Sequence, residues 1–271
     1  MRGWLGPALV DRIVAADAAL RTPVPLSRRV AFVETYPGVG SAELAAAAAN
    51  RYALRRHAPV LLVDAAGASQ QRPAQVAPGT APVANAGAGS LVAAGLDPAR
   101  TEATASTRRA RPQSLADALD GLPTTGHGVT CLGLPAPAGA GANVPTVADW
   151  EAQVGVLARF LDVVVTDFGA RRGNEVAAIA PASHAICVVT PPGRPAVEAA
   201  VHLARQALAS GCPAFVTLVS QRRAPSLLAA RRLAAGLSAP AAVIRRRRPG
   251  IGEDEVAATA LTIALRRREP S

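Results

Sequence analysis

The residues best suited to chemistry lie in a glycine-containing segment near the N-terminus. It reads Glu34-Thr35-Tyr36-Pro37-Gly38-Val39-Gly40-Ser41-Ala42-Glu43, after the apolar run Val30–Thr35 and before the Ala-rich stretch Ser41–His57. Glycines between a strand and a helix let backbone N–H groups face phosphate oxygens. A loop that handles nucleotides also needs a Lys for the phosphates and a Ser or Thr for Mg²⁺. This chain has no Lys, because all 29 of its basic residues are Arg.

Two aspartates follow apolar runs and are candidates for the same site. Asp64 ends the run Val60–Asp64, and Asp167 follows the run Asp162–Thr166. In a parallel sheet both would lie at the carboxyl ends of the strands, where ligands bind. Each aspartate is also compatible with a simple role in capping the loop after its strand.

The other reactive side chains are scattered along the sequence. They are His57, His127, His184 and His202, together with Cys131, Cys187 and Cys212. Their spacing matches no metal site, redox pair or catalytic triad, so we expect no metal. The odd number of cysteines argues against a disulfide framework and indicates a reducing compartment.

Composition restricts the class of protein further. The chain has 271 residues, of which half are apolar, and only eight are aromatic, which excludes an aromatic platform for stacking nucleobases. The N-terminus lacks a signal-peptide pattern, and no uninterrupted apolar stretch reaches about 18 residues. We therefore expect a cytoplasmic protein. The bias toward Arg, Ala, Gly and Pro is typical of a GC-rich, bacterial genome.

Apolar runs alternate with helical patterns along most of the chain. The expected strands are Val30–Thr35, Val60–Asp64, Val129–Leu134, Asp162–Thr166, Ala185–Thr190, Ala214–Val219 and Ala241–Ile244. The expected helices are Ser41–His57, Ser114–Leu119, Thr146–Phe160, Pro195–Ser210, Pro225–Ala235 and Asp254–Arg268. Fully apolar strands favour a parallel sheet covered on both sides. The fold expected is α/β: a Rossmann-like, doubly wound, mostly parallel sheet of about seven strands with helices on both faces.

The periodicity also suggests how the chain is divided. Residues 1–27 are predicted to form an N-terminal helical extension, and residues 28–271 a single α/β domain. From about residue 65 to 112 the sequence is rich in Ala, Gly and Pro and shows no periodicity. Such a composition buries little apolar surface, so this insertion is predicted to be mostly disordered.

The glycine-containing segment resembles the loop of the MinD/ParA-type (deviant Walker, SIMIBI class) P-loop ATPases, which reads Lys-Gly-Gly-Val-Gly-Lys-Thr-Thr. Tyr36 and Ser41 stand where that family has its two lysines, and Pro37 replaces a glycine. Ala42 replaces the threonine that binds Mg²⁺. Gly38, Val39 and Gly40 match.

Further segments match the same family in the same order. They are Val60–Asp64, Ser114–Leu119, Gly128–Ala136, Asp162–Gly169, Ala185–Val197 and Phe215–Ser220. The resemblance implies that Asp64 corresponds to the aspartate that positions the attacking water. It places Asp167 where Mg²⁺ is supported, and Ser220 where an Asn contacts adenine. It covers about residues 28–265, excluding the insertion.

The departures from the family pattern indicate lost catalysis. Phosphoryl transfer depends on positioning and charge stabilisation, and the loop lacks both lysines that provide it. Tyr36–Ala42 is thus interpreted as a vestigial nucleotide loop, and Asp64 and Asp167 as vestigial water and Mg²⁺ positions. No cofactor is expected, although ATP with Mg²⁺ remains an alternative if an arginine replaces the lysines. Arg171 and Arg172 are the nearest candidates.

The function implied is that of a pseudo-ATPase that acts as a positioning, assembly or scaffold factor. The resemblance implies a protein partner in a pilus or secretion apparatus, in septum placement or in chromosome partitioning, and a homodimer is compatible with it. An active, nucleotide-switched ATPase with non-standard residues is the first alternative. A nonspecific DNA-binding accessory protein is the second.

Clusters of arginine support the DNA alternative. A polyanion-binding surface is predicted at Arg222, Arg223, Arg231, Arg232, Arg245, Arg246, Arg247 and Arg248. A solvated Arg-rich surface is an equally simple reading. The last helix carries Val256, Ala260, Leu261 and Ala264 on one side, which favours packing in the domain over membrane anchoring. Recruitment to a membrane or to the nucleoid stays open.

The altered loop also has a predicted shape. Pro37 fixes one backbone angle, removes one N–H donor and restricts the residue before it. We expect a loop that is closed without a ligand, has a mouth less positive than that of an active relative, and exposes Tyr36.

Overall fold

Most of the α/β domain is described by the computed structural model. The described residues are 7–24, 27–67, 112–135, 144–220, 232, 241–245 and 251–266. The strands are β1 (Arg28–Glu34), β2 (Val60–Asp64), β3 (Val129–Gly133), β4 (Val163–Ala170), β5 (Ala185–Thr190), β6 (Ala214–Ser220) and β7 (Ala241–Arg245). The helices are α1 (Pro7–Arg21), α2 (Ser41–Arg56), α5 (Leu115–Leu119), α6 (Val147–Trp150), the π-helix η2 (Glu151–Gly155), α7 (Val156–Ala158), α8 (Gly173–Ile179), α9 (Arg194–Ala209) and α11 (Ile251–Arg266).

These strands form one sheet in the order β3-β2-β4-β1-β5-β6-β7, and all of the pairings are parallel. Strands β2, β3 and β4 lie on one side of β1, and β5, β6 and β7 lie on the other. The sheet is therefore doubly wound. The predicted fold class is thereby confirmed, and the parallel order brings the carboxyl ends of β1, β2 and β4 side by side.

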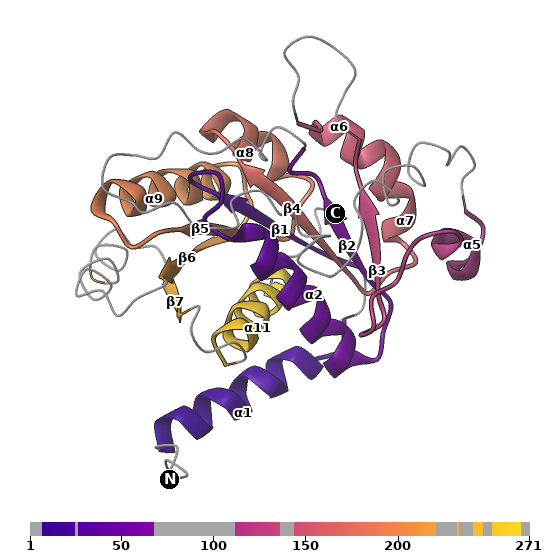
Figure 1. Cartoon of the computed structure of the whole chain (residues 1–271), viewed down its shortest axis with the longest axis horizontal. Coiled ribbons are helices and arrows are strands. Elements are labelled where there is room, and N and C mark those ends of the chain that lie inside the picture. Colours follow the sequence, from indigo (N-terminus) through magenta and orange to yellow (C-terminus); the bar gives the residue numbers. More distant parts are fainter. Residues whose placement is uncertain are drawn as a thin grey trace.

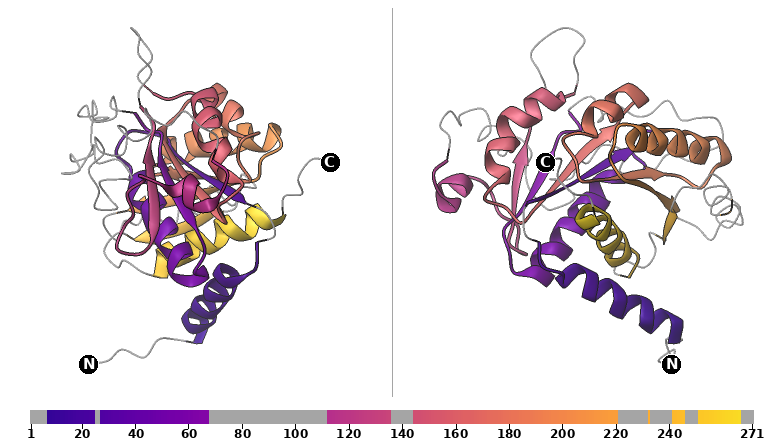
Figure 2. Two further views of the ribbon diagram at one scale, coloured as in Figure 1. Left: turned by 90° about the vertical axis from the view of Figure 1, so that its right-hand side faces the viewer. Right: turned by 180° about the vertical axis from the view of Figure 1, so that it is seen from behind.

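Helices cover both faces of the sheet (Figures 1 and 2). Successive residues of β1 belong to two separate cores, because side chains alternate across a strand. Val30 and Phe32 pack with the face covered by α2 and α11, whereas Ala31 and Val33 pack with the face covered by α8 and α9. This double burial explains why β1 is apolar from Val30 to Val33.

Helix α1 packs on the domain. Its residues Ala16 and Leu20 are buried in the core shared with α2 and α11. The Arg56 side chain at the end of α2 donates to the carbonyl of Leu20 at 3.1 Å and to that of Thr22. Arg56 also donates to Asp162 at 2.6 Å, just before β4. The predicted N-terminal extension therefore contributes to the core.

The helix expected over 146–160 is present but irregular. Thr146 caps it: its hydroxyl accepts from the Asp149 N–H at 3.2 Å, and the Asp149 carboxylate accepts from the Thr146 N–H at 2.8 Å. Residues 151–155 then widen into a π-turn between α6 and α7. Trp150 directs its indole N–H to the Thr166 hydroxyl at 2.9 Å, which locks this helix onto β4.

Strand β4 continues further than predicted. The apolar run suggested an end at Thr166, but pairing with β1 extends to Ala170 across a register shift after Phe32. Asp167 is therefore part of strand β4, and its backbone pairs with β1 on one side and with β2 on the other.

Two other predictions meet the limits of the described chain. The insertion was predicted to begin near residue 65, but Ala65 and Ala66 are buried, and residues 68–111 lie outside the described residues. The helix predicted at 225–235 also lies outside them, except for Arg232.

The terminal helix α11 is a packed domain helix, as its pattern predicts. Val256, Ala260, Leu261 and Ala264 are all buried against the sheet and α2. Across the described ranges, no helix has the length and apolarity needed to cross a bilayer.

Candidate functional site

The candidate site lies in the loop between β1 and α2, at the carboxyl edge of the sheet. Gly38 and Gly40 adopt φ angles of 82° and 116°, which side chains with a Cβ rarely reach. These two turns direct the backbone N–H groups of Gly38, Gly40 and Ser41 toward one point. The loop thus has the cradle that its sequence predicts, at the N-terminus of a 16-residue helix.

That point is filled by the carboxylate of Glu34, the last residue of β1. One of its oxygens accepts from the Gly38 N–H at 2.9 Å. The other accepts from the N–H groups of Gly40 at 3.2 Å and Ser41 at 3.3 Å. Glu34 is 4% exposed, and burial raises its pKa against the lowering effect of the three hydrogen bonds. The Glu34 carboxyl group therefore fills the centre of the loop and satisfies three of its backbone N–H groups.

Ser41 and Asp167 are joined by a buried hydrogen bond. The Ser41 hydroxyl donates to Asp167 Oδ1 at 2.8 Å, and the same oxygen accepts from the Gly169 N–H at 3.0 Å. Asp167 is 1% exposed. Burial, followed by repulsion from Asp64 and Glu34, raises its pKa well above the usual value. Ser41 therefore links the loop to β4 without supplying a positive charge.

Asp64 completes a group of three carboxylates that we call the acidic cluster: Glu34, Asp64 and Asp167. Asp64 pairs in register with Asp167 across β2 and β4, and its Oδ1 accepts from the Ala66 N–H at 3.1 Å. Among the described residues, no three His, Cys, Asp or Glu side chains are arranged to hold a metal ion. The acidic cluster thus brings three interacting carboxyl groups together beneath the loop.

Arg171 lies beside the cluster but is engaged elsewhere. Its Nη2 donates to the carbonyls of Ala65 at 2.8 Å and Pro145 at 3.4 Å, and its guanidinium stacks over Phe168 at 5.9 Å. It is 7% exposed, and burial lowers its pKa. Arg171 therefore fastens the loops after β2 and before α6.

Arg172, the other candidate to replace a lysine, starts a helix. Its backbone N–H donates to the Glu175 carboxylate at 2.7 Å, which caps α8. Within the described part of the chain, Arg171 is hydrogen-bonded to Ala65, Pro145 and Ala170 and Arg172 to Glu175, all outside the loop between β1 and α2.

The outer part of the loop matches the shape predicted for it. Tyr36 is 45% exposed, which confirms that it lies at the surface. Behind it, the Thr35 N–H donates to the Val189 carbonyl at 3.0 Å, and the Thr35 hydroxyl donates to Thr190 at 3.1 Å. The loop is therefore anchored to β5 and closed over Glu34, with an aromatic ring outside.

Sequence reasoning missed Glu34, the residue that closes the loop. The other carboxylate of this segment, Glu43, lies on the first turn of α2. The available signal was a single carboxylate at the end of an otherwise apolar strand, four residues before the first loop glycine. A buried charge in that position needs donors, and the nearest ones are the N–H groups of the loop.

The predicted polyanion surface lies mostly outside the described residues. Arg232 is exposed and helical, and Arg245 ends β7 at the edge of the sheet. Arg222, Arg223, Arg231, Arg246, Arg247 and Arg248 are beyond the described ranges. The DNA alternative therefore stays a prediction.

Among the scattered histidines and cysteines, His184 and the three cysteines are buried, whereas His57, His127 and His202 are exposed. His184 is buried, and its Nδ1 accepts from the Arg29 N–H at 3.0 Å. Cys131, Cys187 and Cys212 are buried and form no disulfide bond. Burial raises the pKa of Cys131 and of Cys187 to about 12.

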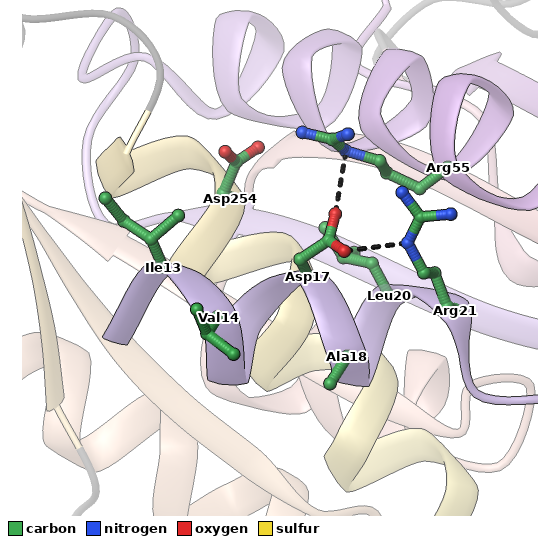
Figure 3. A pocket seen from close by; sticks show the side chains of 8 residues that line it. All are labelled: Ile13, Val14, Asp17, Ala18, Leu20, Arg21, Arg55 and Asp254. Atoms are coloured by element: carbon green, nitrogen blue, oxygen red, sulfur yellow. Dashed lines mark hydrogen bonds and ion pairs between the residues drawn. The ribbon is translucent and has the colours of Figure 1, made fainter. Parts of the chain in front are cut away.

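A surface hollow lies far from the loop between β1 and α2. It has a volume of about 550 Å³ and is bordered by α1, α2 and α11 (Figure 3). Asp17 of α1 forms one ion pair with Arg21 of the same helix at 2.7 Å and another with Arg55 of α2 at 3.2 Å. Arg55 is 14 residues from Ser41 on the same helix, about 21 Å along its axis. This hollow is therefore separate from the acidic cluster.

Comparison with solved structures identifies the architecture. A ParA family ATPase from Chlorobium tepidum superimposes with a TM-score of 0.53 at 18% identity, over 86% of this chain and 91% of the other. A plasmid partition protein from Borrelia burgdorferi gives 0.53 at 11% identity, over 88% and 99%. The fold is that of the MinD/ParA-type P-loop ATPases.

The same fold extends to a biosynthetic enzyme. Cobyrinic acid a,c-diamide synthase from Mycobacterium smegmatis, with bound ADP and magnesium, gives a TM-score of 0.51 at 17% identity, over 87% of this chain and 93% of the other. No protein-family model and no curated protein matches the sequence. At these identities the similarity establishes the fold alone, so the residues of the loop must carry any argument about function.

Proposed function

We propose that the protein is a catalytically inactive MinD/ParA-type pseudo-ATPase that works by binding a protein partner as a positioning, assembly or scaffold factor. The observation that carries this proposal is the Glu34 carboxyl group inside the loop. It engages the backbone N–H groups of Gly38, Gly40 and Ser41, and the chain has no lysine that could supply positive charge there.

Electrostatics argues against a bound nucleoside triphosphate. A triphosphate carries several negative charges, and in a site of low dielectric constant repulsion from carboxylates is much stronger than in water. In P-loop enzymes lysine and Mg²⁺ offset this charge. Here Ala42 offers no oxygen for Mg²⁺, and Ser41 is hydrogen-bonded to Asp167. We therefore expect neither ATP nor Mg²⁺ as a cofactor.

A binding role is supported by the outer surface of the loop. Tyr36 exposes 45% of its surface on a segment whose backbone is fixed by β5 and by Glu34. A tyrosine on a rigid support can bury a large area in an interface at little entropic cost. The solved structures of this fold include a plasmid partition protein, which supports a partitioning system as the setting. Septum placement and a pilus or secretion apparatus are further settings included in the proposal.

The decisive experiment is nucleotide turnover by the purified chain with Mg²⁺. Neither ATP nor GTP should be hydrolysed above background, and wild type should not differ from Asp64→Ala or Asp167→Ala. Asp117→Ala, an exposed carboxylate on α5, is the control for nonspecific loss of charge. Turnover that Asp64→Ala and Asp167→Ala abolish and Asp117→Ala leaves intact would establish the rival, active ATPase.

A further inference from the structure

The loop is closed by an internal ligand that belongs to the same chain. Both oxygens of the Glu34 carboxylate are used, by donors from three loop residues, at 2.9–3.3 Å. Backbone N–H groups at the start of a helix bind phosphate, sulfate and carboxylate with the same chemistry. The arrangement is a complete anion-binding cradle with a carboxylate already in place.

The backbone of Glu34 is held on both sides. It pairs with Ala170 of β4 and with Val189 of β5, so the last residue of β1 cannot move without breaking the sheet. Only rotation of the side chain could remove the carboxylate from the cradle. Because Glu34 is 4% exposed, the cradle is closed to solvent anions while that rotamer persists.

We propose that Glu34 is an autoinhibitory contact: its carboxylate occupies a functional anion cradle formed by Gly38, Gly40 and Ser41, and removing it opens that cradle to phosphate or sulfate. This inference rests on the proposed function, since it explains how the loop of a pseudo-ATPase stays closed. The inference goes further than the proposed function, because it holds that the cradle of backbone N–H groups can still bind an anion. An external anion must compete with a tethered group whose effective concentration is about millimolar or higher.

The test uses the full chain and inorganic anions. Sodium phosphate and sodium sulfate are titrated at constant ionic strength into wild type and Glu34→Ala, with the backbone N–H signals of Gly38 and Gly40 followed by NMR. In Glu34→Ala these signals should shift saturably at millimolar anion. In wild type the apparent affinity should be at least tenfold weaker. Glu43→Ala makes the same change of charge on the first turn of the same helix and should behave as wild type.

Two results would overturn the inference. One is a Glu34→Ala protein whose Gly38 and Gly40 signals respond no more than those of wild type. The other is an equal gain in Glu43→Ala, which would assign the effect to net charge. Neither result bears on nucleotide turnover by wild type, so failure of the contact and failure of the proposed function are distinguishable.

A measurement on wild type covers the case in which Glu34→Ala does not fold. Hydrogen exchange of the Gly38, Gly40 and Ser41 N–H groups should be slowed to within about tenfold of the N–H groups inside β1, because all three are hydrogen-bonded to Glu34 and Gly40 and Ser41 are also buried. Exchange at the rate of an open loop would show that the carboxylate does not hold the cradle closed.

Discussion

Neutralising Asp167 should stabilise the protein at neutral pH. Its two hydrogen bonds, from the Ser41 hydroxyl and the Gly169 N–H, both end on Oδ1. The carboxamide of Asp167→Asn keeps an oxygen in that position and replaces only Oδ2. The substitution therefore preserves the local contacts and removes a buried negative charge.

The magnitude follows from the pairing of β2 with β4. Asp64 and Asp167 are in register on parallel strands, which lie about 4.8 Å apart. Two unit charges at about 5 Å repel each other by about 3 kcal/mol with an effective dielectric constant of about 20. Asp64 is partly exposed, which screens the repulsion. We expect a net gain of about 1–2 kcal/mol, or a rise in melting temperature of about 3–6 °C.

The stability gained by Asp167→Asn should increase as the pH rises. Because the pKa of Asp167 is raised in the folded state, that state keeps a proton which the unfolded chain has already released. Wild type therefore loses stability as pH rises from about 3.8 through the folded pKa. Asp167→Asn has no such loss, so its advantage should be small at pH 3.5 and largest at neutral pH.

The assay is urea unfolding of both proteins across that range of pH. Asp162→Asn provides a control of opposite sign, because Asp162 accepts from the Arg56 guanidinium at 2.6 Å and its neutralisation should destabilise. An Asp167→Asn protein less stable than wild type at neutral pH would refute the repulsion between Asp64 and Asp167.

Two further predictions concern the core. Trp150→Phe should lower the free energy of unfolding by about 2–3 kcal/mol, because it removes the hydrogen bond to Thr166 at 2.9 Å and leaves a void; the urea midpoint should fall with an unchanged slope. The three cysteines should not react with a thiol reagent at pH 7 until urea unfolds the chain, since all are buried and the thiolates of Cys131 and Cys187 are suppressed by a pKa of about 12; rapid labelling of the native protein would contradict their burial.

The sequence predicts the architecture well because the central strands are buried on both faces. Val60–Asp64 and Ala185–Thr190 are apolar up to a polar last residue, so their bounds are visible in the composition, and the structure reproduces them. The helix cap at Thr146 can also be predicted from the sequence. The Thr146 hydroxyl and the Asp149 carboxylate, three residues apart, each accept a hydrogen bond from the backbone N–H of the other residue.

What the sequence does not predict depends on contacts between distant segments. Strand β4 continues to Ala170 because β1 offers it partners across a register shift. Arg171 is fixed by the carbonyls of Ala65 and Pro145, which only the folded sheet brings to it. The position of Glu34 depends on a side-chain rotamer beneath a loop, and a carboxylate at the end of a strand does not specify that rotamer.

The Glu34 contact also determines in which order a nucleotide site could be rebuilt on this scaffold. Ser41→Lys alone would place an ammonium next to Asp167 and beneath the Glu34 carboxylate, where these internal acids would neutralise it. Only after Glu34 has been replaced would the same lysine face an open cradle. The two substitutions are thus epistatic, since residues that share a partner do not act additively. A single carboxylate at the end of β1 would make the inactive state difficult to reverse by one mutation at a time.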